Sequence, residues 1–212
     1  MEQPTVHSGL PFAQSAENNR EPILAELPRL LKDRSSVLEI GAGTGQHAVA
    51  FAGALSHVQW QPTEHPDTLV TLRPRVEAAA LANLARPAAL DIAEGPWPSV
   101  WPDAVYTANT LHIVSRELVE KLFHALGEHA TPGSRLLVYG PFNYNGSFTT
   151  PSNEQFDAWL RERNPVSGIR DFEWVDDLAR AAGYALVEDV TMPANNRLLC
   201  WEVGASTPFK RQ

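Results

Sequence analysis

Apolar and polar positions along the chain predict strands and helices in turn. Apolar runs of strand length cover residues 37–41, 58–64, 88–92, 104–108, 135–139, 185–190 and 197–203. Apolar residues recur at helical spacing over 46–55, 66–82, 116–129, 153–163 and 173–182, and an earlier helix carries Ile23, Leu24, Leu27, Leu30 and Leu31 on one face. Strands alternating with helices predict a parallel, doubly wound α/β sheet.

Breaker residues divide these elements. Pro28 is expected to kink or shorten its helix and Pro74 to break the helix over 66–82, and the stretches 94–102 and 141–152 are expected to be loops. The pair Asn195-Asn196 is a turn signal, so the last two strands are predicted to form a hairpin with one antiparallel strand. We expect an irregular extension over 1–17, one domain over 18–205 and a polar tail over 206–212.

Three glycines at alternate positions follow the strand over 37–41: Gly41, Gly43 and Gly45. Glycine has no Cβ, so a ligand can approach the backbone closely at such a turn. The helix that starts behind it offers unpaired N–H groups and a partial positive charge. This pattern predicts a site for a nucleotide-like cofactor, whereas an ordinary tight turn rarely needs three glycines.

The glycine spacing leaves two cofactor classes open. When the dinucleotide-binding fingerprint G-x-G-x-x-G is aligned to begin at Gly41, its last glycine falls on Gln46, so this alignment fails. When it is aligned to begin at Gly43, its last position falls on Ala48, and the fingerprint allows alanine there. The tight strand exit at Gly41 favours the alternative pattern E-x-G-x-G-x-G, which begins at Glu39. No lysine follows the glycines, so the phosphate loop of nucleoside triphosphatases is excluded.

Composition narrows the function classes. The chain of 212 residues is 43% hydrophobic, which suffices for a packed core, and its formal net charge of −8 argues against a nucleic-acid partner. The single cysteine, Cys200, allows no internal disulfide and gives no metal-site spacing. No secretory signal and no apolar run of membrane-spanning length is found, so we expect a cytoplasmic protein without membrane contact.

The pattern E-x-G-x-G-x-G resembles motif I of the class I S-adenosylmethionine (SAM)-dependent methyltransferases. Five further runs are similar to a family of predicted methyltransferases of unknown function, DUF938 or methyltransferase-like 26: residues 18–24, 58–64, 106–113, 140–146 and 193–199. The resemblance covers about residues 18–203 and implies a Rossmann-like seven-stranded sheet of order 3-2-1-4-5-7-6 with the seventh strand antiparallel and helices on both faces. It implies SAM binding at the carboxyl ends of the strands, and it carries over no substrate.

The resemblance also implies roles for individual residues in cofactor binding. Gly41, Ala42, Gly43 and Gly45 form the loop beneath the cofactor. Glu39 helps to fix the methionine end of the cofactor or the loop, with a purely structural bond to loop amides as the alternative.

Three further positions complete the implied cofactor site. Glu64, 19 residues beyond Gly45, is the acid that accepts from the ribose hydroxyls; Asp67 replaces it if the strand ends later, and a merely solvated acid is the alternative. Asp91 and Ile92 fit the adenine site, unless Asp91 caps the next loop. Asn109 follows the fourth strand, where the methionine part of the cofactor is contacted.

Residues near the same strand ends are candidates for the acceptor side. His112 is the candidate general base, since an imidazole can take a proton at neutral pH, and His47 is assigned a structural role. Tyr144 and Asn145 are expected to orient the acceptor, with Tyr144 a second catalytic candidate. Asn19 and Arg20 are expected at the same mouth, where the arginine would bind a carboxylate or phosphate. Turn formation and helix capping are the alternatives for these segments.

These observations predict in-line transfer of a methyl group to a small molecule, chemistry that needs mainly alignment and exclusion of water. Residues 109–112 do not form the Asn/Asp-Pro-Pro-Tyr run that goes with methylation of nucleobase amines. Two alternatives stay open. One is a non-catalytic protein that binds SAM or S-adenosylhomocysteine, or a partner subunit; the other is an NAD-type oxidoreductase. The oligomeric state is left open.

Overall fold

The computed structural model describes residues 5–7 and 9–204, so the predicted polar tail over 206–212 lies outside the described residues. The chain divides after Thr107 into two compact units, and each is described by itself. Over the described ranges, no helix is both long enough and apolar enough to cross a membrane.

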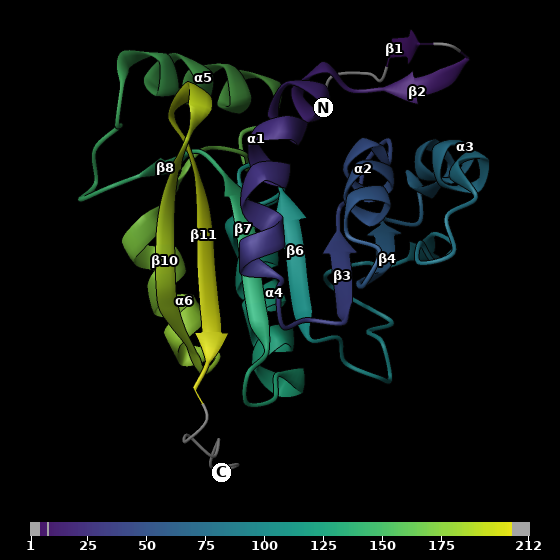
Figure 1. The fold of residues 1–212 in the computed structure, drawn as a ribbon. Helices are drawn as coiled ribbons and strands as arrows, with labels where there is room; N and C mark the ends of the chain where they lie inside the picture. Colours follow the sequence, from purple (N-terminus) through teal and green to yellow (C-terminus); the bar gives the residue numbers. More distant parts are fainter. Residues whose placement is uncertain (1–4, 8, 205–212) are drawn as a thin grey trace. The chain divides into compact units, whose positions relative to one another are not determined.

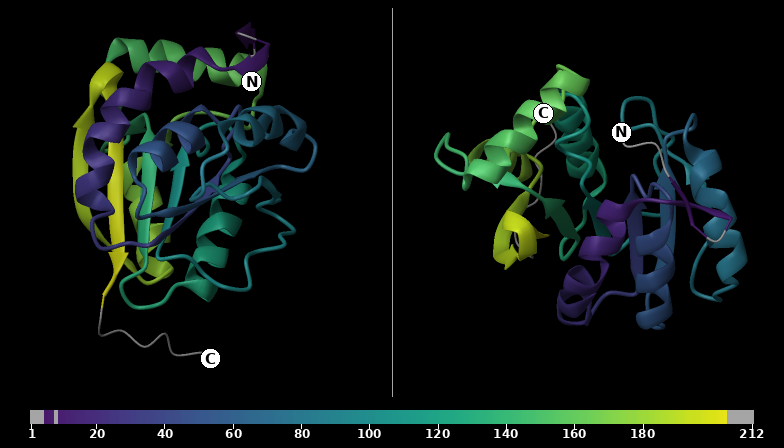
Figure 2. Two further views of the ribbon diagram at one scale, coloured as in Figure 1. Left: turned by 45° about the vertical axis from the view of Figure 1, so that its right-hand side comes forward. Right: turned by 90° about the horizontal axis from the view of Figure 1, so that it is seen from above.

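The first unit is built on parallel strands (Figure 1). Strand β3 pairs in parallel with β4 on one side and with β6 on the other, and β4 pairs with β5. Its elements are β1 Thr5–His7, β2 Leu10–Phe12, α1 Gln14–Leu30, β3 Ser36–Ile40, α2 Gln46–Ala54, β4 Gln59–Glu64, α3 Leu69–Ala79, β5 Ala88–Ala89 and β6 Ala104–Ala108, which ends just past the division. Helices α1 and α2 lie side by side (Figure 2).

The start of the chain is more ordered than the sequence predicts. Strands β1 and β2 pair antiparallel, and α1 begins at Gln14, so an irregular extension over 1–17 is wrong for this part. Helix α1 contains Pro22 and Pro28 and is nevertheless continuous. Ile23 and Leu27 are fully buried on one face of α1. Burial of such side chains stabilises a helix enough to offset a missing backbone hydrogen bond.

Two other elements of this unit end earlier than predicted. Strand β5 covers two residues rather than 88–92, because Asp91 and Gly95 exchange backbone hydrogen bonds that close a tight loop. Helix α3 passes through Pro74 without a break, so the predicted break there is wrong, and it ends at Ala79, just before Ala80, whose backbone is left-handed. Leu69, Leu72 and Val76 of α3 form a buried cluster, the apolar face that holds this helix in place.

The second unit contains α4 Arg116–His129, β7 Arg135–Gly140, β8 Phe142–Asn143, α5 Pro151–Arg163, β9 Arg170–Asp171, α6 Phe172–Ala181, β10 Tyr184–Met192, the 3-10 turn Pro193–Asn195 and β11 Asn196–Val203. Strands β10 and β11 form the predicted antiparallel hairpin, and β11 runs antiparallel to β7. The stretch 141–152, predicted as a loop, holds β8, which pairs in parallel with β9. Two-residue strands are too short to leave a pattern in the sequence.

The seven principal strands follow the order β10-β11-β7-β6-β3-β4-β5. Read from β5, this is the predicted order 3-2-1-4-5-7-6, with the seventh strand, β11, antiparallel to β7. Helices alternate with the strands along the chain. The predicted Rossmann-like α/β fold is therefore confirmed.

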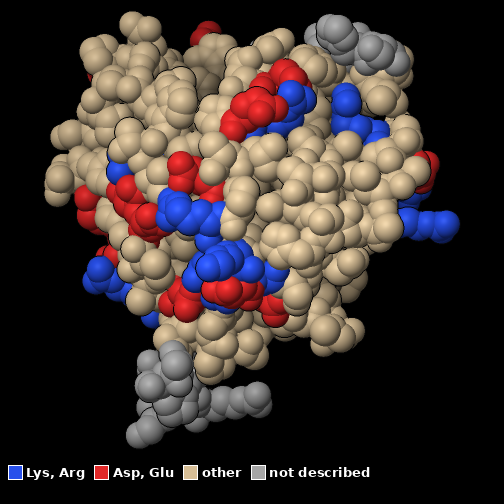
Figure 3. All heavy atoms as spheres, viewed as in Figure 1, with Lys and Arg blue, Asp and Glu red and all other residues tan. Residues whose placement is uncertain are grey.

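Charged side chains of both signs are mixed on the surface. Lys and Arg side chains lie next to Asp and Glu side chains on the face that Figure 3 draws. Arg20 pairs with Glu17, and Arg197 pairs with Asp189. The exclusion of a nucleic-acid partner was inferred from net charge and stays a prediction.

Candidate active site

The loop between β3 and α2 is shaped by its three glycines. Gly41, Gly43 and Gly45 have φ angles of 71°, 59° and 77°, a region that other residues rarely adopt. A Cβ on Gly45 would lie 2.9 Å from Cδ1 of Leu72, so Gly45 serves the packing of the loop on α3. A Cβ on Gly43 would have nothing within 4 Å, so the backbone at Gly43 faces open space that a ligand can enter.

Glu64, the predicted ribose acid, ends β4 and holds the glycine loop. Its Oε2 accepts from the backbone N–H of Gly43 at 2.6 Å, and its Oε1 accepts from His65 N–H at 2.8 Å and from Thr68 Oγ1 at 2.9 Å. The side chain of Asp67 is 87% exposed and lies past the end of the strand. Of the two acids, Glu64 therefore lies at the loop, and its Oε2 has a lone pair left for a ligand hydroxyl.

Asp91 follows β5 in a turn of its own. Its Oδ1 accepts from Ala93 N–H at 2.8 Å, the capping bond that was the alternative to an adenine contact. The Oδ2 atom lies 3.5 Å from Nε2 of His65. Ile92 lies next in this turn and is partly exposed. The capping role is observed, and adenine binding by Asp91 and Ile92 stays a prediction.

Glu39 is buried within β3. Its Oε2 accepts from the indole Nε1 of Trp60 at 2.7 Å, and no amide of the glycine loop bonds to this carboxyl group among the described residues. Burial raises the pKa of Glu39 to about 8, with Glu64 adding repulsion and the bond from Trp60 acting in the opposite direction. The group is therefore largely protonated at pH 7.

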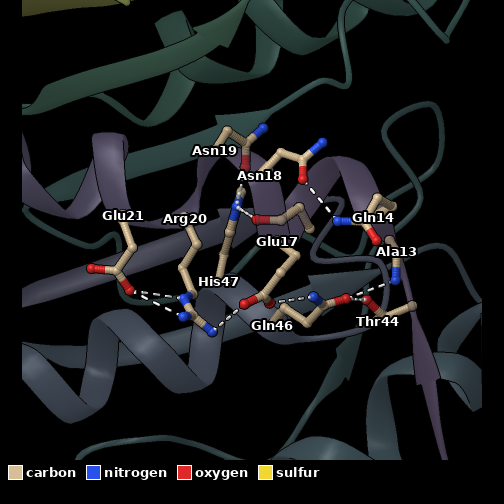
Figure 4. A network of polar contacts seen from close by, with 11 residues as sticks. Ala13, Gln14, Glu17, Asn18, Asn19, Arg20, Glu21, Thr44, Gln46 and His47 are labelled. Carbon is tan, nitrogen blue, oxygen red and sulfur yellow. Dashed lines mark hydrogen bonds and ion pairs between the residues drawn. The ribbon is translucent and has the colours of Figure 1, made fainter. Parts of the chain in front are cut away.

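The N-terminal segment is tied to the glycine loop through Gln46, the first residue of α2 (Figure 4). The Oε1 atom of Gln46 accepts from Ala13 N–H at 2.7 Å and from Thr44 Oγ1 at 2.8 Å, and its Nε2 donates to Glu17 at 2.9 Å. Ala13 precedes α1 and offers no side-chain cap of its own. Gln46 thus supplies a bond at the start of α1 and joins it to the loop.

Arg75 of α3 adds a second connection between the same segments. Its Nε donates to the carbonyl of Thr44 at 3.0 Å and its Nη2 to the carbonyl of Pro11 at 2.7 Å. Thr71 of α3 also donates to the carbonyl of Gly43, at 3.1 Å. Sequence reasoning missed Gln46 and Arg75, because nothing local marks a residue whose partners lie about 30 to 60 positions away.

Asn19 is buried against α2 rather than at an open mouth. Its Oδ1 lies 2.7 Å from Nε2 of His47, which also lies 3.1 Å from the carbonyl of Ala16. Both partners are acceptors, so Nε2 carries the proton and Nδ1 accepts from the Tyr106 hydroxyl at 3.2 Å. Burial lowers the pKa of His47 to about 4. The predicted structural role of His47 agrees with these contacts.

Arg20 is engaged by two acids of its own helix. Its Nη1 lies 2.9 Å from Glu17 and its Nη2 lies 3.1 Å from Glu21 (Figure 4). The charge that was expected to bind a carboxylate or phosphate is therefore compensated within α1. Substrate binding by Asn19 and Arg20 stays a prediction, and their contacts favour a role in holding α1.

In the second unit, Asn109 comes directly after β6 with a left-handed backbone, φ 58°. Its N–H donates to the carbonyl of Tyr139 at 2.8 Å. Asparagine tolerates this conformation better than most residues. A left-handed backbone at Asn109 is typical of turns at functional sites. Contact between Asn109 and the methionine part of the cofactor stays a prediction.

His112 is buried rather than at an exposed rim. Its ring meets Phe156 edge to face at 5.5 Å, and Nδ1 would lie 3.5 Å from a Cβ on Gly140. Burial, and then the charge of Arg170, lower its pKa to about 4. His112 is thus neutral at pH 7, and a base with such a low pKa takes a proton weakly.

Tyr144 and Asn145 lie in a tight turn after β8. The Tyr144 hydroxyl donates to Asp189 Oδ2 at 2.8 Å, its ring stacks on Phe172, and burial and Asp189 raise its pKa. Asn145 and Gly146 both have positive φ, as a two-residue hairpin turn requires. Turn formation, the alternative, therefore accounts for Asn145, and Tyr144 is a hydrogen-bond donor rather than a base.

The chain matches a known protein family and resembles solved structures of methyltransferases. A family model described as "Protein of unknown function (DUF938)" matches residues 10–203. The SAM-dependent methyltransferase SibL in its apo form is 24% identical, with a TM-score of 0.75 over 90% of this chain and 56% of that chain. An O-methyltransferase family protein from Burkholderia thailandensis is 14% identical, with a TM-score of 0.79 over 92% of this chain and 59% of that one.

Human N-acetylserotonin methyltransferase, solved in complex with SAM, is 15% identical, with a TM-score of 0.75 over 91% of this chain and 53% of that one. The chain thus spans between 53% and 59% of the length of these three chains. At such identities the similarity establishes the fold.

Proposed function

Because the chain belongs to the DUF938 family and has the fold of the methyltransferases compared above, we propose that it is a SAM-dependent methyltransferase acting on a small molecule. The observation that carries the proposal is the open backbone at Gly43 beside the Glu64 carboxylate. An acid at the end of a strand can accept hydrogen bonds from ribose hydroxyls, and an exposed glycine beside it lets the rest of the cofactor approach the backbone closely.

In this proposal, the residues that the sequence pattern predicts for cofactor binding hold the cofactor. The glycine loop lies beneath it, Glu64 accepts from the ribose hydroxyls, and Asp91 with Ile92 meets the adenine. Asn109 contacts the methionine part. When bound, SAM supplies a methyl group that the sulfonium charge already activates. Glu39 supports the strand beneath the loop through its bond to Trp60.

We assign the chain's own contribution mainly to alignment of the acceptor and exclusion of water. The low pKa of His112 and the raised pKa of Tyr144 support this assignment, because neither residue suits the removal of a proton at pH 7. The catalytic roles that the sequence suggests for His112 and Tyr144 stay predictions, and Tyr144 also stays a candidate for positioning the acceptor. A small-molecule acceptor is supported by the fold that the chain shares with small-molecule methyltransferases, one of which is a mitomycin 7-O-methyltransferase. The absence of a nucleic-acid partner, which the net charge of −8 supports, and a cytoplasmic location belong to the proposal.

Calorimetric titration of the purified chain with SAM and, separately, with NAD tests the proposal. Saturable binding of SAM alone is expected, and binding of NAD alone would overturn the assignment. Turnover against a panel of small hydroxyl, thiol and amine acceptors then separates an enzyme from a protein that only binds SAM. Affinity without product over the whole panel would favour the non-catalytic alternative.

A further inference from the structure

A cavity of about 490 Å³ opens within the second unit. It lies between the start of α4, the paired strands β8 and β9, and the end of α5 with the segment that follows. Three of its lining residues are arginines: Arg116, Arg161 and Arg170. Such a concentration of guanidinium groups in one cavity calls for an explanation, because the charges repel one another.

Arg170 is buried without a carboxylate partner. The residue is 3% exposed, and its Nε and Nη2 donate to the backbone carbonyls of Leu111, Val114 and Val166. Among the described residues, no acid lies within ion-pair distance of Arg170, and Nη1 makes no hydrogen bond. Burial, then Arg116 and Arg161, lower its pKa to about 10. A buried charge of this kind is normally paired, so the two donors at Nη1 invite an anion.

Arg116 is held in position at the same cavity. Its guanidinium lies over the ring of Trp174, 3.8 Å from the centroid, and stacking on an aromatic face leaves the N–H edges available. Arg116 is also the first residue of α4, whose N-cap is Ser115. A positive side chain is unfavourable at the positive end of a helix dipole. An anion bound there would relieve both charges and meet the unpaired N–H groups of the first turn.

Asn143 adds an unpartnered polar side chain. The residue is 9% exposed, lines the cavity, and its Oδ1 is buried without a hydrogen-bond partner. The two ends of an asparagine amide are exchangeable by rotation, so this group can offer a donor to a bound ligand. Buried polar atoms in native proteins are nearly always bonded, and a ligand in the cavity supplies the missing partner.

Among the described residues, the acids around the cavity form no ion pair with Arg116 or Arg170, although the charge of Asp157 opposes the lowering of the Arg170 pKa. Asp157 pairs with Arg161 at 2.6 Å, and Glu117 lies 3.5 Å from Lys121. Asp171 lines the cavity and its charge helps to raise the pKa of Arg161, but within the described part of the chain it forms no ion pair with Arg116 or Arg170. Two guanidinium groups are therefore left to bind a ligand.

We propose that this cavity binds the carboxylate or phosphate group of the methyl acceptor, with Arg116 and Arg170 as its ligands and Asn143 as a further hydrogen-bond partner. The identification of the ligand as the acceptor rests on the proposed methyltransferase function. The anion site itself rests only on the second unit's own geometry. The acceptor class is thus a small organic acid or a phosphorylated small molecule.

The test is a titration of the full chain with benzoate and, separately, with phenyl phosphate. Binding is monitored through the Nε–Hε signals of its arginines in ¹H–¹⁵N spectra. Saturable shifts of the Arg116 and Arg170 signals are expected with at least one probe, and which probe binds more tightly separates a carboxylate from a phosphate ligand. Benzamide, the neutral analogue of benzoate, is expected to give no shift. Absence of any shift with both anions would overturn the proposal.

Variants make the test specific. Arg116→Gln, at an exposed position, is expected to weaken anion binding by about tenfold or more, as the loss of a charged hydrogen bond predicts. Asp171→Asn is expected to strengthen it several-fold, because a negative charge leaves the cavity. Arg163→Gln is the matched control: Arg163 lies over the ring of Trp159 in the same unit but does not line the cavity, and its loss should leave binding unchanged. Equal affinities in all three variants would overturn the proposal.

The same samples are titrated with SAM. Anion binding together with SAM binding supports the assignment to an acceptor. SAM binding without anion binding overturns this inference and leaves the proposed function standing. Anion binding without SAM binding would overturn the acceptor assignment together with the proposed function.

Discussion

The backbone N–H of Gly43 donates to Oε2 of Glu64 at 2.6 Å, so the strand-end acid and the glycine loop form one structural unit. Glu64 also accepts from His65 and Thr68 at the start of the next segment. A carboxylate that accepts several such bonds is held in one orientation. The acid is therefore positioned before any ligand arrives, which limits the ordering cost of binding.

Replacement of Glu64 by alanine is expected to weaken SAM binding by about 1–3 kcal/mol, the usual cost of losing a charged hydrogen-bond partner. Calorimetric titration measures the effect. Asp67→Ala is the control, because this neighbouring acid is 87% exposed in its side chain and should leave the affinity unchanged. A larger loss for Asp67→Ala than for Glu64→Ala would transfer the ribose contact to Asp67.

Gly43→Ala separates backbone strain from loss of the site. Both Gly43 and Gly133 have positive φ, 59° and 86°, and a Cβ on either would meet nothing within 4 Å. Alanine at either position is expected to cost about 1 kcal/mol of stability. Only the Gly43 variant should also lose SAM binding, because its methyl group would occupy the space beside Glu64. Unfolding curves and calorimetry check both parts, and full SAM affinity in Gly43→Ala would show that the loop is not the cofactor site.

The strand-loop-helix around the glycines could be predicted because its signals are local. An apolar strand, alternate glycines and a helix leave a continuous pattern, and Glu64 follows from its distance to Gly45. The hairpin of β10 and β11 likewise has its turn signal, Asn195-Asn196, between the strands. Local patterns of this kind give both the element and its place in the sheet.

The features that the sequence did not reveal depend on distant partners. Helix α1 starts early because Gln46, 33 positions on, accepts from Ala13. Strand β8 forms through pairing of its residues, Phe142 and Asn143, with residues 28 positions later in β9. Asn19 and Arg20 were placed at a binding mouth because the sequence does not show that His47 and Glu17 engage them.

Gln46 is expected to contribute to stability, because it joins the start of α1 to the glycine loop. Gln46→Ala leaves the partly buried Ala13 N–H and the buried Thr44 hydroxyl without their acceptor, at an expected cost of about 1–3 kcal/mol of unfolding free energy. Urea denaturation measures this cost. Gln14→Ala is the control, since Gln14 makes one exposed bond within α1, and it should change stability by less than about 0.5 kcal/mol. Equal effects of the two substitutions would show that the N-terminal segment is not tied down through Gln46.

Three buried titratable groups give the chain opposing responses to pH. Burial lowers the pKa of both His47 and His112 from 6.5 to about 4. Between pH 6.5 and about pH 4 these two histidines bind protons in the unfolded chain but not in the folded protein. The free energy of unfolding therefore falls as the pH drops through this range. Burial raises the pKa of Glu39 from 4.5 to about 8, so the folded chain keeps a proton that the unfolded chain has lost. Stability from Glu39 therefore falls as the pH rises through that range.

We expect these groups to make the free energy of unfolding greatest near pH 6.5. Below this pH the two histidines change the unfolding free energy more steeply than Glu39 does, and above it the effect of Glu39 dominates. Each group contributes a slope of about 1.4 kcal/mol per pH unit inside its window. Between pH 6.5 and 8 the protein should lose about 1–2 kcal/mol of unfolding free energy, measured by urea denaturation. Glu39→Gln, which keeps an acceptor for Trp60, should abolish this loss, whereas Glu21→Gln, at a largely exposed acid, should retain it. An undiminished loss in Glu39→Gln would show that Glu39 is already ionised in the folded protein at pH 6.5.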